Sequence, residues 1–141
     1  MKPFTVEVPI RTYSPNVRTH PIRAAKRRRD ERDSVHWAWI AARRPLVGPV
    51  VAAPPLPVVV TLTRLACNEM DRHDNLRWAM KGVVDEVAIL VGLPITHLAT
   101  AEHGPQANDG DPRVTWVYAQ EKTKRGVYGV RITVEPRKEE P

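Results

Sequence analysis

Alternating and continuous hydrophobic runs predict four β-strands. At 4–8 every second residue is apolar, so one face of this strand is expected to point into a core. The run at 58–66 is rich in β-branched residues, which favours a buried strand. The last two strands are separated by a turn region that ends at Gly126, a spacing that predicts a hairpin. In full, the predicted strands cover 4–8, 58–66, 114–120 and 127–134.

Two further segments have helical periodicity. The first, at 22–44, is ended by Pro45 and Gly48. The second begins near Asp74 and ends at Gly92, and its apolar residues return every three or four positions, as on the buried side of a helix. This apolar stripe consists of Leu76, Met80, Val83, Val84, Val87, Ala88 and Val91.

The order β-α-β-α-β-β predicts the α+β class, with a mixed sheet of about four strands covered by two main helices. Five prolines at 45–57 predict a stiff connector that need not separate domains. The polar stretch 95–110 predicts a long loop, a kind of segment that often has a function. We therefore expect one domain over 1–136, followed by a flexible tail at 137–141.

Charge is distributed unevenly along the chain, whose net charge is +6. Residues 1–44 have eleven Lys/Arg against four Asp/Glu, a net of +7, whereas residues 45–141 have eleven against twelve, a net of −1. A basic first third favours a polyanionic partner such as nucleic acid. The chain begins without the apolar run of a signal peptide, so a cytoplasmic protein is expected. Cys67, the single cysteine, excludes an internal disulfide and a thiolate zinc cluster, and we expect it to be buried.

Acidic residues gather where the second strand leads into the second helix. Asp71 and Asp74 are three positions apart, and Asp111, with Asp109 as its competitor, precedes a later strand. Mg²⁺ prefers carboxylate oxygens, and strand ends can meet at one edge of a sheet. Asp71, Asp74 and Asp111 are therefore candidate metal ligands. As the alternative, Asp71 or Asp74 caps the helix, and Asp109-Gly110 forms a turn.

Lys81 lies on the side of the second helix opposite the apolar stripe, together with Asp85. It is a candidate for holding a phosphate or neutralising charge near a metal, and a solvated ion pair with Asp85 is the alternative. His73 fits a metal ligand or general base, or an exposed loop residue. Three tryptophans in regular elements are expected to pack in the core or at a subunit interface; they are Trp37, Trp39 and Trp116.

The chain from Phe4 to about Val134 resembles the RusA family of Holliday-junction resolvases, small endonucleases often encoded by phages. The segments that resemble the family are Asp74-Asn75-Leu76, Ser14-Pro15-Asn16-Val17-Arg18 after the first strand, and Asp109-Gly110-Asp111-Pro112 before a later strand. The family motif is Asp-x-Asp-Asn-Leu, and Arg72 stands here at its first aspartate. Asp71 or His73 would have to serve in its place.

The resemblance implies a homodimer, in the cytoplasm of a bacterial host, that resolves four-way DNA junctions by paired nicks with Mg²⁺ or, in its place, Mn²⁺. Asp74, Asp111 and Asp71 would hold the ion, and Lys81 would stabilise charge developing on the phosphorane. Neither a membrane nor a small-molecule substrate is implied. The residues expected to contact DNA are Asn16, Arg18, Arg23, Lys26, Arg27, Arg28, Arg29 and Arg32. The alternatives are a protein that binds branched DNA without cutting it and an RNA-binding or RNA-cutting protein.

Overall fold

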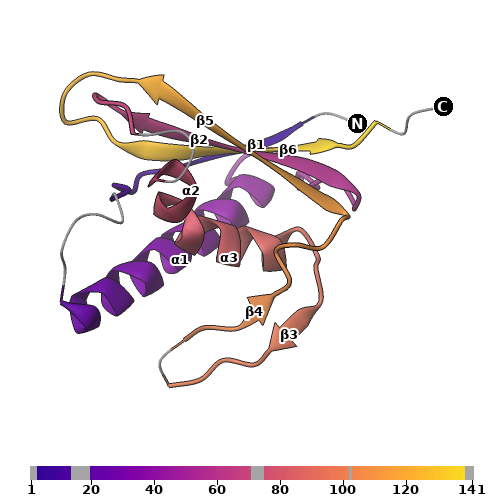
Figure 1. Cartoon of the computed structure of the whole chain (residues 1–141). Helices are drawn as coiled ribbons and strands as arrows, with labels where there is room; N and C mark the ends of the chain where they lie inside the picture. The colour runs from indigo at the N-terminus through magenta and orange to yellow at the C-terminus, as the bar shows by residue number, and fades with distance from the viewer. Residues whose placement is uncertain (1–2, 14–19, 71–74, 102, 139–141) are drawn as a thin grey trace.

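A mixed four-stranded sheet with helices on one of its faces forms the body of the protein (Figure 1). The computed structural model describes residues 3–13, 20–70, 75–101 and 103–138. The strands of the sheet, in spatial order, are β1 (Phe4–Val8), β6 (Gly129–Pro136), β2 (Val58–Ala66) and β5 (Val114–Lys122). The predicted α+β class and four-stranded mixed sheet are therefore confirmed.

The position of β6 differs from the hairpin expected of the last two strands. β6 lies between β1 and β2 and is antiparallel to both, whereas β5 pairs in parallel with β2, with Val58 opposite Val114. The expected hairpin is therefore wrong. β6 takes the central position because its inward-facing side chains are fully buried in the core. β5 has several exposed residues and occupies the edge of the sheet.

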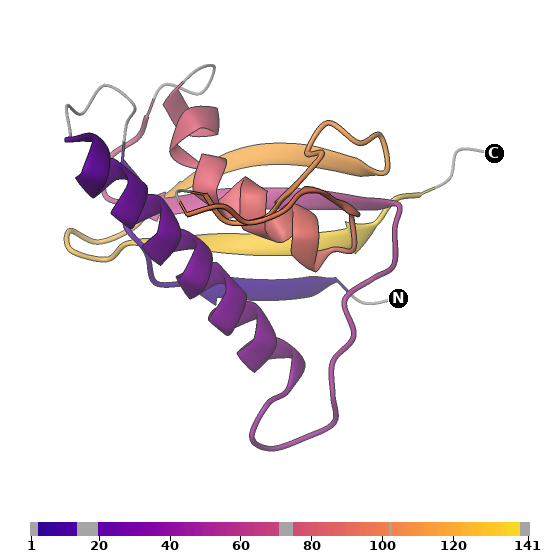
Figure 2. The same cartoon turned by 90° about the horizontal axis from the view of Figure 1, so that it is seen from below.

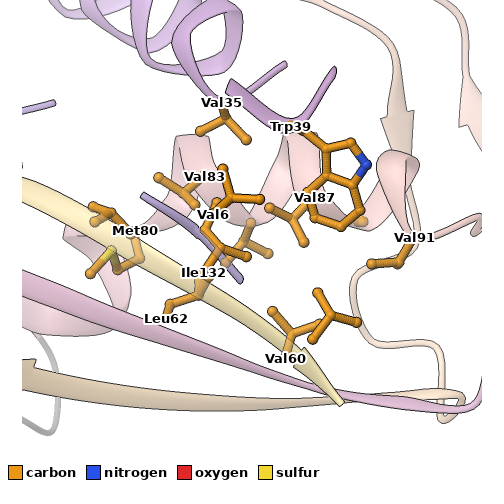
Figure 3. Close-up of a cluster of buried hydrophobic side chains, with 14 of the residues drawn as sticks. Val6, Val35, Trp39, Val60, Leu62, Met80, Val83, Val87, Val91 and Ile132 are labelled. Carbon is orange, nitrogen blue, oxygen red and sulfur yellow. The ribbon is translucent and has the colours of Figure 1, made fainter. Parts of the chain in front are cut away.

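Three helices cover the sheet on the side shown below it in Figure 1: α1 (Pro21–Arg43), α2 (Asn75–Ala79) and α3 (Lys81–Leu90). α1 crosses the sheet obliquely and passes over β1 (Figure 2). Between helices and sheet lies an apolar core (Figure 3). Its labelled side chains include Val35 and Trp39 of α1, Val83 and Val87 of α3, Leu62 of β2 and Ile132 of β6.

The single helix expected from residue 74 to residue 91 is divided in two at Met80. The backbone of Met80 departs from helical geometry, with φ −93° and ψ 2°, and α3 begins at the next residue. All seven residues of the predicted apolar stripe are nevertheless buried, so the periodicity is confirmed although the continuity is wrong. Gly92 ends α3 with a positive φ of 105°, a conformation that glycine adopts without strain.

A short two-stranded sheet occupies the segment expected to be a loop. Its strands are β3 (Ile95–His97) and β4 (Gln106–Ala107), which pair in antiparallel fashion. Residues 95–101 and 103–107, called the arm below, lie on the same side of the four-stranded sheet as the helices (Figure 1). The loop prediction was therefore incomplete, because so short a pair of strands has little periodicity to reveal it.

Further expectations for individual residues and segments have different outcomes. α1 agrees with the predicted helix to within one residue at each end, and among the described residues no helix is both long enough and apolar enough to cross a membrane. Trp39 is buried, but Trp37 is 67% exposed and so lies outside the core. Cys67 is exposed, so the expectation of a buried thiol was wrong. Arg137, predicted to lie in a flexible tail, donates hydrogen bonds to the carbonyls of Pro57 and Pro112.

Candidate functional site

Lys81, the first residue of α3, places its amine between two carboxylates. Its Nζ lies 3.0 Å from Oδ1 of Asp85, one turn further along the helix, and 2.9 Å from Oδ2 of Asp109. The pair with Asp85 is the one that helical spacing predicts, whereas the contact with Asp109 joins residues far apart in the sequence. Lys81, Asp85 and Asp109, called the Lys81 cluster below, line a hollow of about 510 Å³ beside the arm.

The electrostatic surroundings of Lys81 keep its amine charged. Partial burial disfavours the ammonium, but hydrogen bonds to Asp109 and Asp85 outweigh this effect and raise the pKa of Lys81 above its usual value of 10.5. Lys81 is therefore a cation at neutral pH and acts as a donor rather than a base. A charged donor of this kind suits a phosphate oxygen.

The edge strand β5 holds Asp109 in place. The indole Nε1 of Trp116 donates a hydrogen bond of 2.8 Å to the backbone carbonyl of Asp109. Two positions further along β5, the phenol of Tyr118 lies close enough to Arg77, Asp109 and Lys81 for their charges to affect its pKa. Burial raises the pKa of its phenol, and the two cations oppose that rise. Trp116, expected in the core or at an interface, packs against the core and also holds the backbone of a candidate site residue.

Asp111, the predicted ligand next to Asp109, has a local partner. Its two carboxylate oxygens accept hydrogen bonds from Nε and Nη2 of Arg113, at 3.1 and 3.0 Å. These bonds, followed by one from the Arg113 backbone N–H, lower the pKa of Asp111 to about 2. The carboxylate is ionised, but a guanidinium already occupies it. The structure thus brings Asp109, rather than Asp111, to Lys81.

The predicted ligands Asp71 and Asp74 lie outside the described residues, as does His73. The backbone that precedes them is attached to β5, because Met70 exchanges two hydrogen bonds with the side chain of Gln120, at 2.7 and 2.8 Å. Over the part of the chain that the structure describes, no group of three His, Cys, Asp or Glu residues is arranged to hold a metal ion. The assignment of Asp71 and Asp74 to a metal therefore stays a prediction.

Sequence reasoning missed the part that β5 plays at this site. Trp116, Tyr118 and Gln120 alternate along the strand, are all partly buried, and contact or adjoin residues of the candidate site. Polar and aromatic side chains at every second position of a strand are a recognisable signal, since such residues share one face.

The predicted DNA-contacting residues of α1 have different surroundings. Arg28 and Arg29 are exposed, Lys26 pairs with Asp30 at 3.5 Å, and Arg27 stacks over Tyr13 with 4.3 Å from the guanidinium carbon to the ring centroid. Exposed guanidinium groups on one helix are suited to phosphates without reading sequence. Arg23 is also exposed. Asn16 and Arg18, in contrast, lie outside the described residues.

Arg32 is engaged within the protein rather than presented to a ligand. Its Nε donates to Oε2 of Glu86 on α3 at 3.0 Å, its Nη2 donates to the carbonyl of Pro105 in the arm at 2.6 Å, and its side chain is only 11% exposed. His36 lies 3.2 Å from the other oxygen of Glu86. Arg32 therefore joins α1, α3 and the arm, and we separate it from the exposed arginines of α1.

Glu31 is a buried carboxylate at the contact between α1 and α3. Burial raises its pKa to about 7, although the neighbouring charges of Arg27 and Arg28 oppose the rise. The helices approach closely at Gly82, where a Cβ atom would lie 2.7 Å from Oε2 of Glu31. Glu31 therefore changes its charge near neutral pH. It lies next to Gly82, the residue that follows Lys81.

Comparison of the chain with protein-family models, with curated proteins and with solved structures gave no match. What the site can do therefore follows from its own chemistry. A charged amine, two carboxylates and a neighbouring basic helix form a combination suited to an anionic substrate near a cation.

Proposed function

We propose that this protein is a metal-dependent endodeoxyribonuclease that resolves four-way junctions and other branched DNA by paired nicks. The observation that best supports the proposal is the Lys81 cluster, in which a protonated amine lies between two carboxylates in a hollow near the basic surface of α1. Phosphodiester hydrolysis needs both kinds of group: carboxylates for a divalent cation, and a positive donor for charge that develops on the phosphate.

The chemistry of the available donors suits Mg²⁺, which takes hard oxygen ligands and keeps several waters. Asp74 and Asp109 are the residues that we expect to hold the ion, with Asp71 and Asp111 as further candidates. The side chain of Asp109 is 41% exposed and so can reach an ion from solvent. Mg²⁺, or Mn²⁺ in its place, supplies Lewis-acid polarisation of a phosphoryl oxygen when bound. Lys81 donates to a phosphate oxygen, while Asp85 orients the amine and Trp116 holds the backbone of Asp109.

The resemblance to the RusA family supports the choice of substrate. The Asp74-Asn75-Leu76 motif precedes Lys81 along the chain, and the α+β class is the one that the resemblance implies. A homodimer would present two such sites across a two-fold axis, matching a junction that is itself nearly two-fold symmetric. Equilibrium sedimentation of the purified protein tests this: a monomer at the concentrations that cleave junctions would contradict paired nicking by a dimer.

A cleavage assay tests the proposal directly. Purified protein is incubated with an end-labelled four-way junction and Mg²⁺ or Mn²⁺, and binding is measured separately by gel shift. We expect paired nicks from the wild type, and we expect Asp74→Asn and Asp109→Asn to bind junctions but not cut them. Binding without nicks over a range of both metals would overturn the nuclease proposal and favour a non-cutting branched-DNA binder. Preferential competition by structured RNA would favour the RNA alternative.

A further inference from the structure

A second hollow continues from the Lys81 cluster toward the start of α1. It has a volume of about 370 Å³ and lies between the first turns of α1 and the arm, with Lys81 and Asp85 at one end. Because these two residues also line the hollow of the candidate site, the two spaces adjoin. We call this second space the α1–arm groove.

The charge of the α1–arm groove suits phosphate groups. Arg28 and Arg29 line it from α1, and Lys81 lines it from α3. Of its described lining residues, Asp85 is the acidic one, and Lys81 already pairs with it. The groove therefore has an excess of positive charge over the length of one or two phosphates.

The size and lining of the groove favour a single strand rather than a duplex. A volume of about 370 Å³ lies near the lower end of the range for small-molecule pockets and holds about one nucleotide. A neighbouring space of about 370 Å³ shares Ala25 and Arg29 with it and adds Ile22, which is 72% exposed. An apolar wall beside a basic one matches a nucleotide, whose base has an apolar face and whose phosphate is anionic.

Side-chain hydrogen bonds hold the arm, which forms the outer wall of the groove, to the helices. The guanidinium of Arg32 joins Glu86 of α3 to the carbonyl of Pro105. It also fills the space next to Gly104, where an added Cβ would lie 2.8 Å from Nη1. A wall held in this way does not have to be ordered on binding, which lowers the cost of association. Arg32 is thus a positioning residue for the groove.

We infer that the α1–arm groove and the apolar space beside it bind an unpaired DNA strand. Its phosphates would lie on Arg28, Arg29 and Lys81, and a base would lie against Ile22 and Ala25 in the neighbouring space. This inference rests on the proposed function and deepens it. The feature that the protein would recognise in a branched substrate is the unpaired strand at the branch point, which the groove directs toward the Lys81 cluster.

The experiment measures the binding of a fluorescently labelled ten-residue oligothymidylate by anisotropy over a range of salt concentrations. We expect the double variant Arg28→Gln/Arg29→Gln to bind roughly tenfold more weakly, and its dependence of log K on log salt to be shallower by about 1.4, since each phosphate contact on a single strand contributes about 0.7. Arg43→Gln/Arg44→Gln is the matched control, because it removes the same charge from the other end of α1. An equal loss in both variants would overturn the inference.

A second pair of variants tests shape without changing charge. Ala25 lines both the groove and its apolar neighbour, so Ala25→Leu should fill the space and weaken oligothymidylate binding, whereas Ala41→Leu, at an exposed position of the same helix, should not. Circular dichroism confirms that each variant is folded. If Ala25→Leu does not fold, the arginine pair still decides the question. Unchanged binding by a folded Ala25→Leu contradicts the inference.

Competition identifies the occupant. Unlabelled oligothymidylate should displace the probe better than an unlabelled DNA duplex of equal length or an oligouridylate, and better competition by either would overturn the assignment to unpaired DNA. Junction cleavage is scored separately on the same variants. Cleavage by the wild type with no dependence of oligonucleotide binding on Arg28 and Arg29 refutes the groove alone. Groove-dependent binding without cleavage by the wild type refutes the nuclease proposal alone.

Discussion

On one face of α3, Val83 and Val87 are fully buried against α1 and the sheet (Figure 3). On another face of the same helix, Lys81 and Asp85 line a solvent-accessible hollow. The apolar face determines where the helix lies, because a close-packed core allows little displacement. The position of the helix also fixes the place of its polar face, on which Lys81 contacts Asp109. One short helix therefore carries two sets of residues, one that stabilises the fold and one that is available for chemistry.

The largest effect should come from the core beneath α1 and α3. Trp39 is buried and contacts the ring of Phe4 edge-on, with 4.7 Å between ring centroids. We expect Trp39→Ala to lower the free energy of unfolding by about 3–5 kcal/mol, because a large cavity replaces packed atoms. Urea denaturation measures the change. Trp37→Ala is the control, since the side chain is exposed, and should change stability by less than about 0.5 kcal/mol. Similar losses for both would mean that the core is misplaced.

Lys81→Met tests the polar face of α3. Loss of a preorganised positive donor should reduce the rate of junction cleavage by roughly 10²–10³-fold, with little change in the urea midpoint. Single-turnover cleavage kinetics measure the effect at saturating enzyme. Lys124→Met, an exposed lysine between β5 and β6, removes the same charge and should leave the rate unchanged. Equal losses for the two lysines would show that only net charge matters.

Glu31→Gln tests the contact between α1 and α3 through the pH dependence of stability. The folded protein favours the protonated carboxyl, because burial raises the pKa of Glu31 from 4.5 to about 7. Between these values the folded state binds more protons than the unfolded state, so wild-type stability decreases as pH rises from about 4.5 to about 7. Glu31→Gln removes this decrease and should be more stable than wild type above pH 7, on the order of 1–3 kcal/mol.

Thermal and urea denaturation between pH 4 and pH 8 measure the dependence for Glu31→Gln. Glu135→Gln, at an exposed position of β6, is the control and should follow the wild type throughout. A stability difference between Glu31→Gln and wild type that is the same at pH 4 and pH 8 would contradict the assignment.

The smallest effect is expected from Asp111→Asn. Because Asp111 is bonded to Arg113 and Lys81 contacts Asp109 instead, we expect Asp111→Asn to reduce cleavage less than tenfold, whereas Asp109→Asn should abolish it. The same cleavage assay compares the two substitutions at equal enzyme concentration. A reversed order would restore Asp111 as the principal ligand and remove Asp109 from the site.

Much of the fold could be predicted because it depends on local periodicity. The strand at 58–66 was predicted with the bounds that β2 has, and every residue of the apolar stripe at 76–91 is buried. The division at Met80 could not be predicted, since the same stripe suits one helix or two. The position of β6 could not be predicted either, because it results from competition among strands for the centre of the sheet. A hairpin between β5 and β6 would pair the two strands that are adjacent in the sequence, but each strand could also pair with β2.

The candidate site divides in the same way. Spacing along a helix was enough to predict that Lys81 and Asp85 form a pair, because residues four apart are neighbours wherever the helix lies. The sequence led to Asp111 as the expected ligand with Asp109 as its competitor, because two aspartates two residues apart before a strand differ little by pattern. The structure separates them through Arg113, which engages one, and Lys81, which contacts the other.

By itself, the sequence determined the α+β class, most element positions, the basic surface of α1 and the groups available for chemistry. Only the tertiary structure decided that β6 lies between β1 and β2, that Arg32 joins α1, α3 and the arm, and that Asp109 contacts Lys81. The physical reason is the distance along the sequence over which each effect acts. Periodicity acts over a few residues, whereas each of these contacts joins segments whose meeting depends on which apolar surfaces are buried first against which others.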